Sequence, residues 1–313
     1  MKRLHNAAFV VLLAICVAPV HVAGSADQQP PEQAPTGQPP PDAERGPRRR
    51  GPQGPPSLPP FEKTILVLGA ATGFQHDSIS DGMVTIRNMG KDTGMWQAYL
   101  RTDYEWITKG KVGANGKNLD DFDALVFVNT TGRMELSDSQ KQDLLSFVHD
   151  DGKAFVGVHA ALDANYDWPE YAEMIGGWFD AHPWNTFDAP ILLEDPTFPA
   201  VRHFPKAFTK RDEIYQAKQW SRDEVNVLLR LDETKLDYEN NPRIRRTDRD
   251  FAVAWSKMYG KGRVFYSTLG HTNESWTDPD VTTMYFEAIK WALGLTEGST
   301  ESHPKVGPER TSP

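Results

Sequence analysis

Short, continuously apolar runs alternate with longer amphipathic segments through the middle of the chain. Five runs predict strands, the last of them less continuously apolar: Thr64–Leu68, Ala124–Val128, Ala154–Val158, Val264–Thr268 and Gln97–Thr102. Four segments predict helices between or after these strands: Ile79–Met89, Asp138–His149, Pro169–Ile175 and Val281–Leu293. Unbroken apolar strands are buried on both faces, which is typical of a parallel sheet covered by helices. The pattern therefore predicts an α/β fold, with a flavodoxin-like strand order as the default.

Polar residues predict where two of the helices begin. Ser78, with Asp81 three residues later, resembles a capping box, and Ser137 directly precedes the Asp138 helix. A capping side chain accepts a hydrogen bond from an N–H group of the first turn, which has no partner within the helix. Both serines are therefore interpreted as helix-start signals.

The alternation of strands and helices breaks between Trp178 and Asp250. This stretch holds three short β-like pieces separated by polar loops, namely Ile191–Glu194, Glu213–Gln216 and Val225–Leu231. It predicts a β-rich insertion that lies on one edge of the sheet or over its mouth.

The N-terminus has the three parts of an export signal. Lys2 and Arg3 form a short basic region, Ala7–Val20 is almost entirely apolar, and small residues at 22–26 offer a cleavage site. The apolar run is shorter than the roughly 20 residues that span a membrane. Residues 1–26 are therefore predicted to be a cleaved signal peptide, with an uncleaved anchor as the alternative. The mature chain is predicted to be periplasmic or secreted, without a transmembrane span.

Two segments flanking the folded unit are predicted to be disordered. Residues 27–60 are dominated by proline, glycine and glutamine, and such a segment has too few apolar side chains to offset the entropy lost on ordering. Residues 297–313 have a similar composition. The folded domain is thus predicted to span residues 61–296.

Charge and cysteine usage exclude several kinds of partner and chemistry. The formal net charge of −9 becomes more negative when Lys2 and Arg3 leave with the signal, which argues against nucleic acid or an anionic membrane as partner. Cys16, the single cysteine, lies inside the predicted signal, and the bulky Ile15 before it argues against lipid attachment. The mature chain is thus expected to have no thiol nucleophile, thiolate metal ligand or disulfide.

Three histidines follow predicted strands, and open α/β sheets bind ligands at that edge. His76 lies in the loop after the first strand, His159 comes directly after Val158, and His271 follows the last strand. His182 lies in a glycine- and aromatic-rich loop. Capping or packing remains the alternative role for each of these four. By contrast, His149 ends a helix, where it complements the dipole, and His203 reads as an ordinary loop residue.

Several standard sites are missing from the strand ends. The run Gly69–Gly73 lacks the third glycine of a dinucleotide fingerprint, and neither a Walker loop nor a Gly-x-Ser-x-Gly elbow occurs. Two kinds of chemistry remain. One is proton transfer by histidine and carboxylate groups, and the other is a divalent metal such as zinc held by neutral imidazoles and a carboxylate.

Aromatic residues gather in the same loops, and sugars present apolar C–H faces to aromatic rings. Core packing alone explains at least half of these aromatics. The residues concerned are Phe74, Trp168, Trp178, Phe179, Trp184, Trp220 and Trp276.

Five ordered motifs resemble the ThuA-like (trehalose utilisation) family, over about residues 64–294. They are Gly73-Phe74-x-His76-x-Ser78-Ile79, Val156-Gly157-Val158-His159, Gly176-Gly177-x-Phe179-x-x-His182-Pro183, Asp212-Glu213-Ile214-Tyr215 and Gly260-Lys261-Gly262-Arg263-Val264-Phe265-Tyr266-x-x-x-Gly270-His271. The resemblance implies a class I glutamine amidotransferase-like, flavodoxin-related fold. Amidotransferases carry a cysteine on the turn after a central strand, where this chain has His159, so glutaminase activity is not expected. The family name implies breakdown of trehalose or related disaccharides, for which processing through 3-keto sugars has been proposed.

The leading hypothesis is an exported protein of sugar catabolism with a histidine-rich pocket at the carboxyl edge of the sheet. It would be a hydrolase, lyase or isomerase on disaccharides or keto-sugars. Its reaction would use either a divalent metal or a histidine as general base. Catalytic roles are assigned to His76, His159, His271 and Glu213, metal binding to His76, His159, His182 and His271, and substrate binding to Phe74, Asp163, Trp178, His182 and Asn273.

Two further readings stay open. In the first, the chain is a non-catalytic carbohydrate-binding or sensing module, which needs the aromatic loops but not the histidines. In the second, it is a structural domain tethered to a surface partner by the proline-rich linker.

Overall fold

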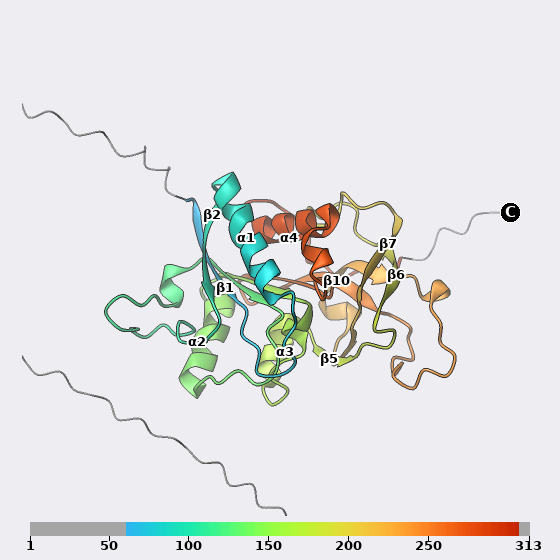
Figure 1. Cartoon of the computed structure of the whole chain (residues 1–313), viewed down its shortest axis with the longest axis horizontal. Coiled ribbons are helices and arrows are strands. Elements are labelled where there is room, and N and C mark those ends of the chain that lie inside the picture. Colours follow the sequence, from blue (N-terminus) through green and yellow to red (C-terminus); the bar gives the residue numbers. More distant parts are fainter. Residues whose placement is uncertain (1–60, 307–313) are drawn as a thin grey trace, which may run out of the picture. The chain divides into compact units, whose positions relative to one another are not determined.

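Five parallel strands form one half of a nine-stranded sheet (Figure 1). The computed structural model describes residues 61–306, so the predicted signal peptide, the predicted linker and residues 307–313 lie outside the described residues. The parallel strands run in the order β2-β1-β3-β4-β11, which confirms the flavodoxin-like order. Their bounds are Lys63–Leu68 for β1, Trp96–Arg101 for β2, Ala124–Val128 for β3, Ala154–Val158 for β4 and Gly262–Ser267 for β11.

Two pairs of helices cover the parallel half, one pair on each face (Figure 1). Helices α1 (Ile79–Thr93) and α4 (Pro279–Ala292) pack on one face, where Met83 and Met284 belong to the same apolar cluster. Helices α2 (Asp138–His149) and α3 (Pro169–Ile175) pack on the other. Every residue of β3 and β4 is buried, because helices cover both faces of these central strands.

Four antiparallel strands extend the sheet beyond β11, in the order β10-β9-β6-β7. The insertion supplies β6, β7 and β9, together with a separate two-stranded sheet of β5 and β8. The sequence did not predict β10, which joins the insertion to the parallel strands. The bounds are Trp178–Ala181 for β5, Thr186–Leu193 for β6, Ala207–Glu213 for β7, Gln216–Lys218 for β8, Asn226–Leu231 for β9 and Ala252–Tyr259 for β10. Short 3₁₀ turns lie at Leu119–Asp121, His159–Leu162, Arg222–Glu224, Glu233–Lys235 and Glu274–Trp276.

The strand predicted at Glu213–Gln216 is wrong. Glu213 ends β7 and Gln216 begins β8, so the chain leaves the main sheet between them. The N–H group of Tyr215 donates to Thr268 Oγ1 at 2.9 Å instead of to a neighbouring strand. This crossing point lies beside the carboxyl end of β11 and places Glu213 there.

The two predicted helix caps differ in outcome. Ser137 caps α2 as expected, because its Oγ accepts from the N–H of Gln140 while the Gln140 side chain accepts from the N–H of Ser137. The prediction for Ser78 is wrong, since its side chain makes no bond to α1. Its hydroxyl instead donates toward the carbonyl oxygens of Gly270 at 3.0 Å and His271 at 2.9 Å. Ser78 therefore holds the loop that carries His271.

Residues 297–306, which the composition assigns to a disordered tail, make specific contacts with β9 and β10. The carbonyl of Ser299 accepts from Asn226 Nδ2 at 2.9 Å and from Ser256 Oγ at 3.2 Å. Further along, Arg230 donates to the carbonyl of Val306 at 2.7 Å. The folded unit thus continues past the predicted boundary at residue 296, because backbone groups, which composition does not register, supply these contacts.

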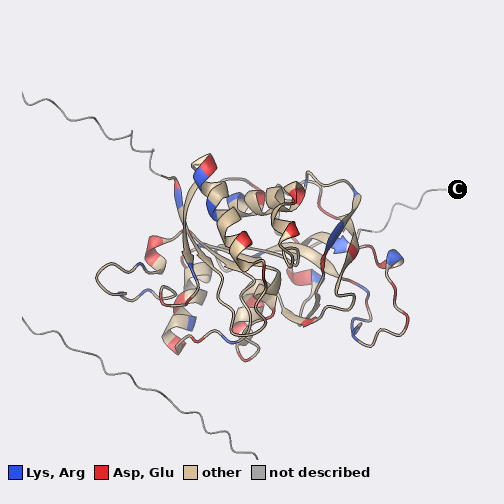
Figure 2. Ribbon diagram, viewed as in Figure 1, with Lys and Arg blue, Asp and Glu red and all other residues tan. Residues whose placement is uncertain are grey.

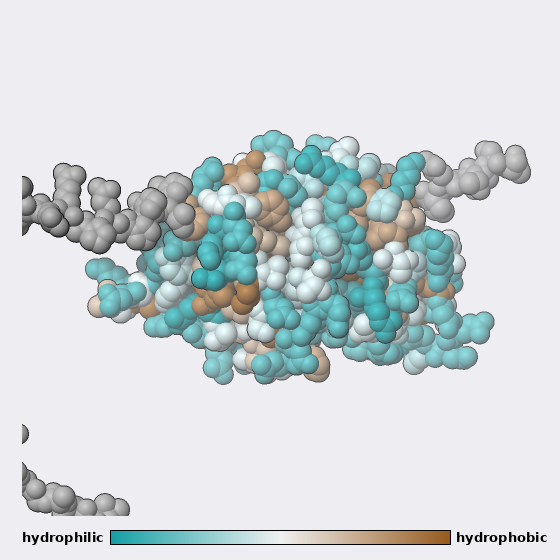
Figure 3. Space-filling view, turned by 45° about the horizontal axis from the view of Figure 1, so that its top comes forward, coloured by the Kyte–Doolittle hydropathy of each residue, from teal (hydrophilic) through white to brown (hydrophobic). Residues whose placement is uncertain are grey.

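The surface of the described residues is polar and mixed in charge. Lys and Arg are interspersed with Asp and Glu along the ribbon (Figure 2), and the face in Figure 3 is mainly hydrophilic with small, separate apolar patches. Within residues 61–306, no helix has the length and apolar character needed to cross a bilayer. The large apolar side chains that are exposed are Phe74, Val84, Tyr166, Met258 and Val306.

Candidate functional site

Side chains from four separate segments meet at the carboxyl edge of the sheet. His76 comes from the loop between β1 and α1, His159 follows β4, and His271 follows β11. Glu213 comes from the end of β7, in the insertion. One nitrogen or oxygen atom of each residue lies within 4.8 Å of the others. The convergence of the three histidines, expected from the strand-end rule, is therefore present, and Glu213 joins them.

Three of these atoms form a compact triangle. His159 Nε2 lies 3.1 Å from His271 Nδ1 and 3.6 Å from Glu213 Oε2, and His271 Nδ1 lies 3.5 Å from the same oxygen. A point equidistant from the three atoms lies about 2 Å from each, close to the Zn–N and Zn–O distances of roughly 2.0–2.2 Å. The triangle therefore has the size that three ligands of one divalent cation require.

His159 is held in one orientation. Its Nδ1 lies 2.6 Å from the carbonyl oxygen of Thr268, and because a carbonyl can only accept, Nδ1 carries the proton. In the neutral ring Nε2 is then the atom with the lone pair. Metal-bound histidines commonly have their other N–H fixed by a carbonyl in this way. The φ of +42° at His159 shows a tight strand-to-turn elbow that aims the ring at the triangle.

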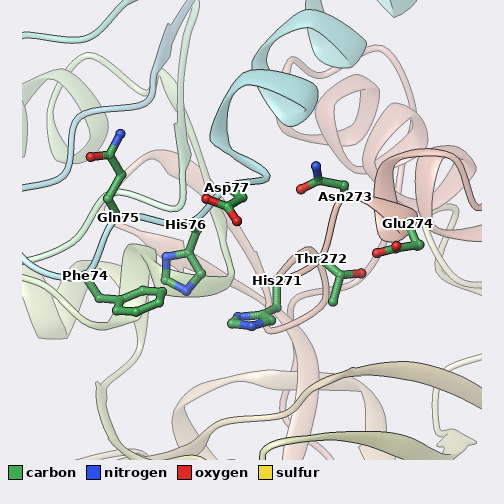
Figure 4. Close-up of a pocket in the computed structure, with 8 residues that line it drawn as sticks. All are labelled: Phe74, Gln75, His76, Asp77, His271, Thr272, Asn273 and Glu274. Carbon is green, nitrogen blue, oxygen red and sulfur yellow. The ribbon is translucent and has the colours of Figure 1, made fainter.

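His76 closes the other side of the cluster. Its ring packs edge-on against the rings of His159 and His271, with centroids 5.0 Å apart in each case. Figure 4 shows the His76 ring facing His271, with Phe74 beside it. Although His76 is only 5% exposed, its Nδ1 has no hydrogen-bond partner within residues 61–306. A buried, unpaired polar atom at a site is typical of a position that a ligand completes.

Burial and the neighbouring imidazoles lower the pKa of two of the histidines, His76 and His271. Burial, together with His159 and His271, lowers the pKa of His76 to about 3. Burial and His159 likewise lower the pKa of His271. For Glu213, burial acts to raise the pKa, but the neighbouring histidines outweigh it and the pKa falls below its usual value. These shifts favour a neutral ring at His76 and His271 and an ionised Glu213, which are the protonation states in which such groups bind metal.

Asp212 supports the cluster from behind, although the sequence did not single it out as a site residue. It is 1% exposed, and its carboxylate accepts from the N–H groups of Gly270 at 2.8 Å and His271 at 3.1 Å. The hydroxyl of Ser275 donates to it at 2.8 Å. Gly270 itself has φ +116°, a conformation that suits glycine. Asp212 therefore fixes the backbone on which His271 is placed.

Asn129 is a second supporting residue that the sequence did not reveal. Its Nδ2 donates to Ser78 Oγ at 2.9 Å and to the carbonyl of Gly270 at 3.1 Å, while its Oδ1 accepts from the N–H of Ala160. One side chain after β3 thus ties together the loops that carry His76, His159 and His271.

His182, predicted as a metal ligand, lies beside Glu213 and outside the group of four donors. Its Nδ1 lies 3.4 Å from Glu213 Oε1, the carboxylate oxygen that faces away from the triangle. His182 also stacks on Phe179, with ring centroids 5.8 Å apart. His182 therefore contacts Glu213 from outside the cluster and supports the position of its carboxylate.

The residues assigned to substrate binding separate into two groups. Phe74 and Asn273 line a cavity of about 380 Å³ that opens onto His76 and His271 (Figure 4). Trp178 is 5% exposed, packs against Tyr166 and does not line this cavity. Asp163 accepts a short hydrogen bond from the Tyr166 hydroxyl and is likewise absent from its lining. Phe74, 66% exposed, is the aromatic side chain available to a ligand here.

The lowered pKa of His76 predicts loss of stability in acid. Unfolded His76 gains its proton near pH 6.5, but the folded protein resists protonation down to about pH 3. As pH falls through this window the unfolded state binds more protons and is favoured. We expect His76 alone to contribute at most about 3 kcal/mol to the stability lost between pH 6.5 and 4.5. Urea unfolding of chelator-treated protein at the two pH values measures this loss.

His149→Gln is the matched control for the acid effect, because His149 is an exposed histidine outside the cluster. His76→Gln should flatten the dependence of the unfolding free energy on pH, whereas His149→Gln should leave it as in the wild type. An unchanged slope in His76→Gln would contradict the assignment.

The comparison with known proteins identifies the same family as the five sequence motifs. The ThuA family model, described as trehalose utilisation, matches residues 64–292. The chain is similar to a ThuA-like protein from Bacteroides uniformis, with a TM-score of 0.61, 18% identity and coverage of 78% of this chain and 95% of that one. A ThuA-like protein from Parabacteroides merdae gives a TM-score of 0.57, 18% identity and coverage of 79% and 93%. At this identity the likeness shows the fold alone. No curated protein matches the sequence.

Proposed function

The chain belongs to the ThuA (trehalose utilisation) family, and from that premise we propose that it is an exported, metal-dependent enzyme of sugar catabolism. Its substrate would be a disaccharide or keto-sugar bound in the cavity over His76 and His271. The family supports the pathway, and the N-terminal sequence supports export. The metal and the reaction class rest on the geometry of the site.

The triangle of donor atoms carries the proposal. His159 Nε2, His271 Nδ1 and Glu213 Oε2 lie 3.1–3.6 Å from one another, which suits one ion with three protein ligands and an open position. The hydrogen bond from His159 to Thr268 and the contact of His182 with Glu213 supply the outer support that such ligands usually have. Since the donors fit a divalent cation, these three residues are assigned to hold it.

The lowered pKa values of His76 and His271 argue against these two residues as a metal-free general base. A general base works best when its pKa lies near the working pH, but the pKa of His76 falls to about 3 and that of His271 is also lowered. A bound cation would polarise a sugar carbonyl or activate water. Around it, His76 offers a neutral ring nitrogen for hydrogen bonding, and Asn273 and Phe74 contact the sugar ring. A hydrolase, lyase or isomerase reaction is compatible with these roles.

Metal content of the purified protein tests the proposal. We expect about one divalent ion per wild-type chain by elemental analysis, and at least about tenfold less in His159→Ala and His271→Ala, because each loses one of three ligands. His149→Ala and His203→Ala, outside the cluster, should retain the wild-type content. A wild type that stays free of metal after incubation with excess Zn²⁺, Mn²⁺ or Co²⁺ would contradict the metal assignment.

A carbohydrate-binding module without catalysis is the second candidate, favoured by the exposed Phe74 ring at the cavity. Calorimetry with trehalose distinguishes the two. The module predicts that Phe74→Ala abolishes binding while His159→Ala leaves it intact. The enzyme predicts that His159→Ala and His271→Ala abolish turnover of trehalose or its 3-keto derivative, followed by mass spectrometry of products.

A further inference from the structure

Three adjoining cavities run along the carboxyl edge of the sheet. The first, of about 380 Å³, opens onto His76 and His271. A second, of about 460 Å³, shares Gln75, His76 and Asp77 with the first. A third, of about 370 Å³, shares Ala70, Ala71 and Thr102 with the second. Each volume lies in the range of roughly 300–1,000 Å³ that is typical of small-molecule sites.

The second cavity lies over the carboxyl ends of β1 and β2. Its floor is the run Gly69-Ala70-Ala71 after β1, and its walls come from Thr102 after β2 and from Ser80 and Met83 of α1. At Gly69 even a Cβ atom would lie 2.3 Å from Met83 Sδ, so α1 packs closely against the start of this run.

The charged residues that line these three cavities are acidic, apart from the histidines His76 and His271. No lysine or arginine lines any of the three cavities; their carboxylates belong to Asp77, Glu274, Asp103, Glu105 and Glu135. Arg101, at the end of β2, donates hydrogen bonds to Asp103 and Glu105 at 2.8 Å each. Its positive charge therefore compensates two of these five carboxylates. Carboxylates accept hydrogen bonds from sugar hydroxyls but repel phosphate and other anions.

We propose that the cavity over β1 and β2 is a second sugar subsite, and that the acidic edge selects uncharged saccharides of at least two rings. The inference rests on the proposed function, since one ring must occupy the cavity at His76 and His271. The other ring lies against Ala71 and Thr102, with His76 and Asp77 at the boundary between the two rings. Phosphorylated sugars are excluded by repulsion from Asp77 and Glu274.

Blocking the second cavity from two walls tests the subsite. Ser80→Trp places a large ring in the cavity from α1, and Thr102→Trp does so from β2. Asn88→Trp adds the same ring to α1 outside these three cavities and is the matched control. Calorimetry on the full chain as purified would compare glucose, trehalose and trehalose 6-phosphate for all four proteins.

The expected result is that wild type and Asn88→Trp bind trehalose at least about tenfold more tightly than glucose, because the second ring adds contacts. Ser80→Trp and Thr102→Trp should lose this preference and keep the affinity for glucose. Trehalose 6-phosphate should bind at least about tenfold more weakly than trehalose at low salt, and the gap should narrow at high salt.

Two outcomes overturn the inference in distinguishable ways. Equal wild-type affinities for glucose and trehalose, or a preference that survives both tryptophan substitutions, overturn the second subsite and leave the proposed function standing. Absence of binding to every sugar overturns the proposed function and this inference with it. Equal or tighter binding of the 6-phosphate overturns the selection against anions.

Discussion

Replacing Asp212 by alanine is expected to lower the free energy of unfolding by about 3–5 kcal/mol. The carboxylate is 1% exposed and accepts from three backbone N–H groups, of Glu213, Gly270 and His271, and from the hydroxyl of Ser275. Alanine leaves these donors buried without that partner, and each orphaned donor costs about 1–3 kcal/mol. A domain with a total stability of roughly 5–15 kcal/mol loses a large share of it.

Equilibrium urea unfolding, followed by tryptophan fluorescence, measures this loss. Asp188→Ala is the matched control, because Asp188 lies on the neighbouring strand β6 with its side chain 71% exposed and paired only loosely with Arg211 at 3.4 Å. An exposed pair of this kind contributes about 0–1 kcal/mol. If Asp212→Ala and Asp188→Ala unfold at the same urea concentration, Asp212 does not hold the His271 loop as described.

Asp212→Asn separates the effect on the site from the effect on folding. The amide keeps the shape of the carboxylate but turns one acceptor into a donor that faces buried donors. We expect the variant to remain folded with a displaced His271 and therefore weaker metal binding. Its metal content, measured at a temperature where circular dichroism shows a native spectrum, reports this displacement directly.

The parallel half of the fold was predictable because its central strands are buried on both faces. Ala124–Val128 and Ala154–Val158 contain no polar residue, and their predicted bounds match β3 and β4. Strand β10 was missed because Ser256 and Lys257 interrupt its apolar run. Lys257 is nevertheless 7% exposed, and its Nζ donates to the carbonyl of Glu173. A buried lysine of this kind is recognised only when its distant partner is known.

The part of the site built from strand ends was predictable from the sequence, whereas the part supplied by the insertion was not. His76, His159 and His271 each follow a parallel strand, so their convergence follows from topology alone. Glu213 was predicted from the motif Asp212-Glu213-Ile214-Tyr215. Its position opposite His159 depends on how the chain passes from β7 to β8. Asp212 and Ser78 act through backbone groups of the Gly270 loop. Such contacts join residues 58 or more positions apart, and no local pattern reports them.

Glu213→Gln is expected to weaken binding of a divalent cation by at least about 100-fold. Changing even an outer-sphere partner of a metal ligand lowers affinity 10- to 100-fold, and Glu213 is placed as a direct ligand with the only negative charge in the triangle. The amide keeps the size and the contact with His182 but removes that charge. The affinity for Zn²⁺ is measured by competition with a chelating dye.

Glu274→Gln is the matched control for the charge, because Glu274 lines the cavity at His271 but does not belong to the cluster of donors. It removes one negative charge near the site and should change the Zn²⁺ affinity by less than about tenfold, through an exposed and screened interaction. If both variants weaken Zn²⁺ binding equally, the cation responds to the general acidity of the cavity and Glu213 is not its ligand. If only Glu213→Gln does so, the triangle of His159, His271 and Glu213 is the metal centre.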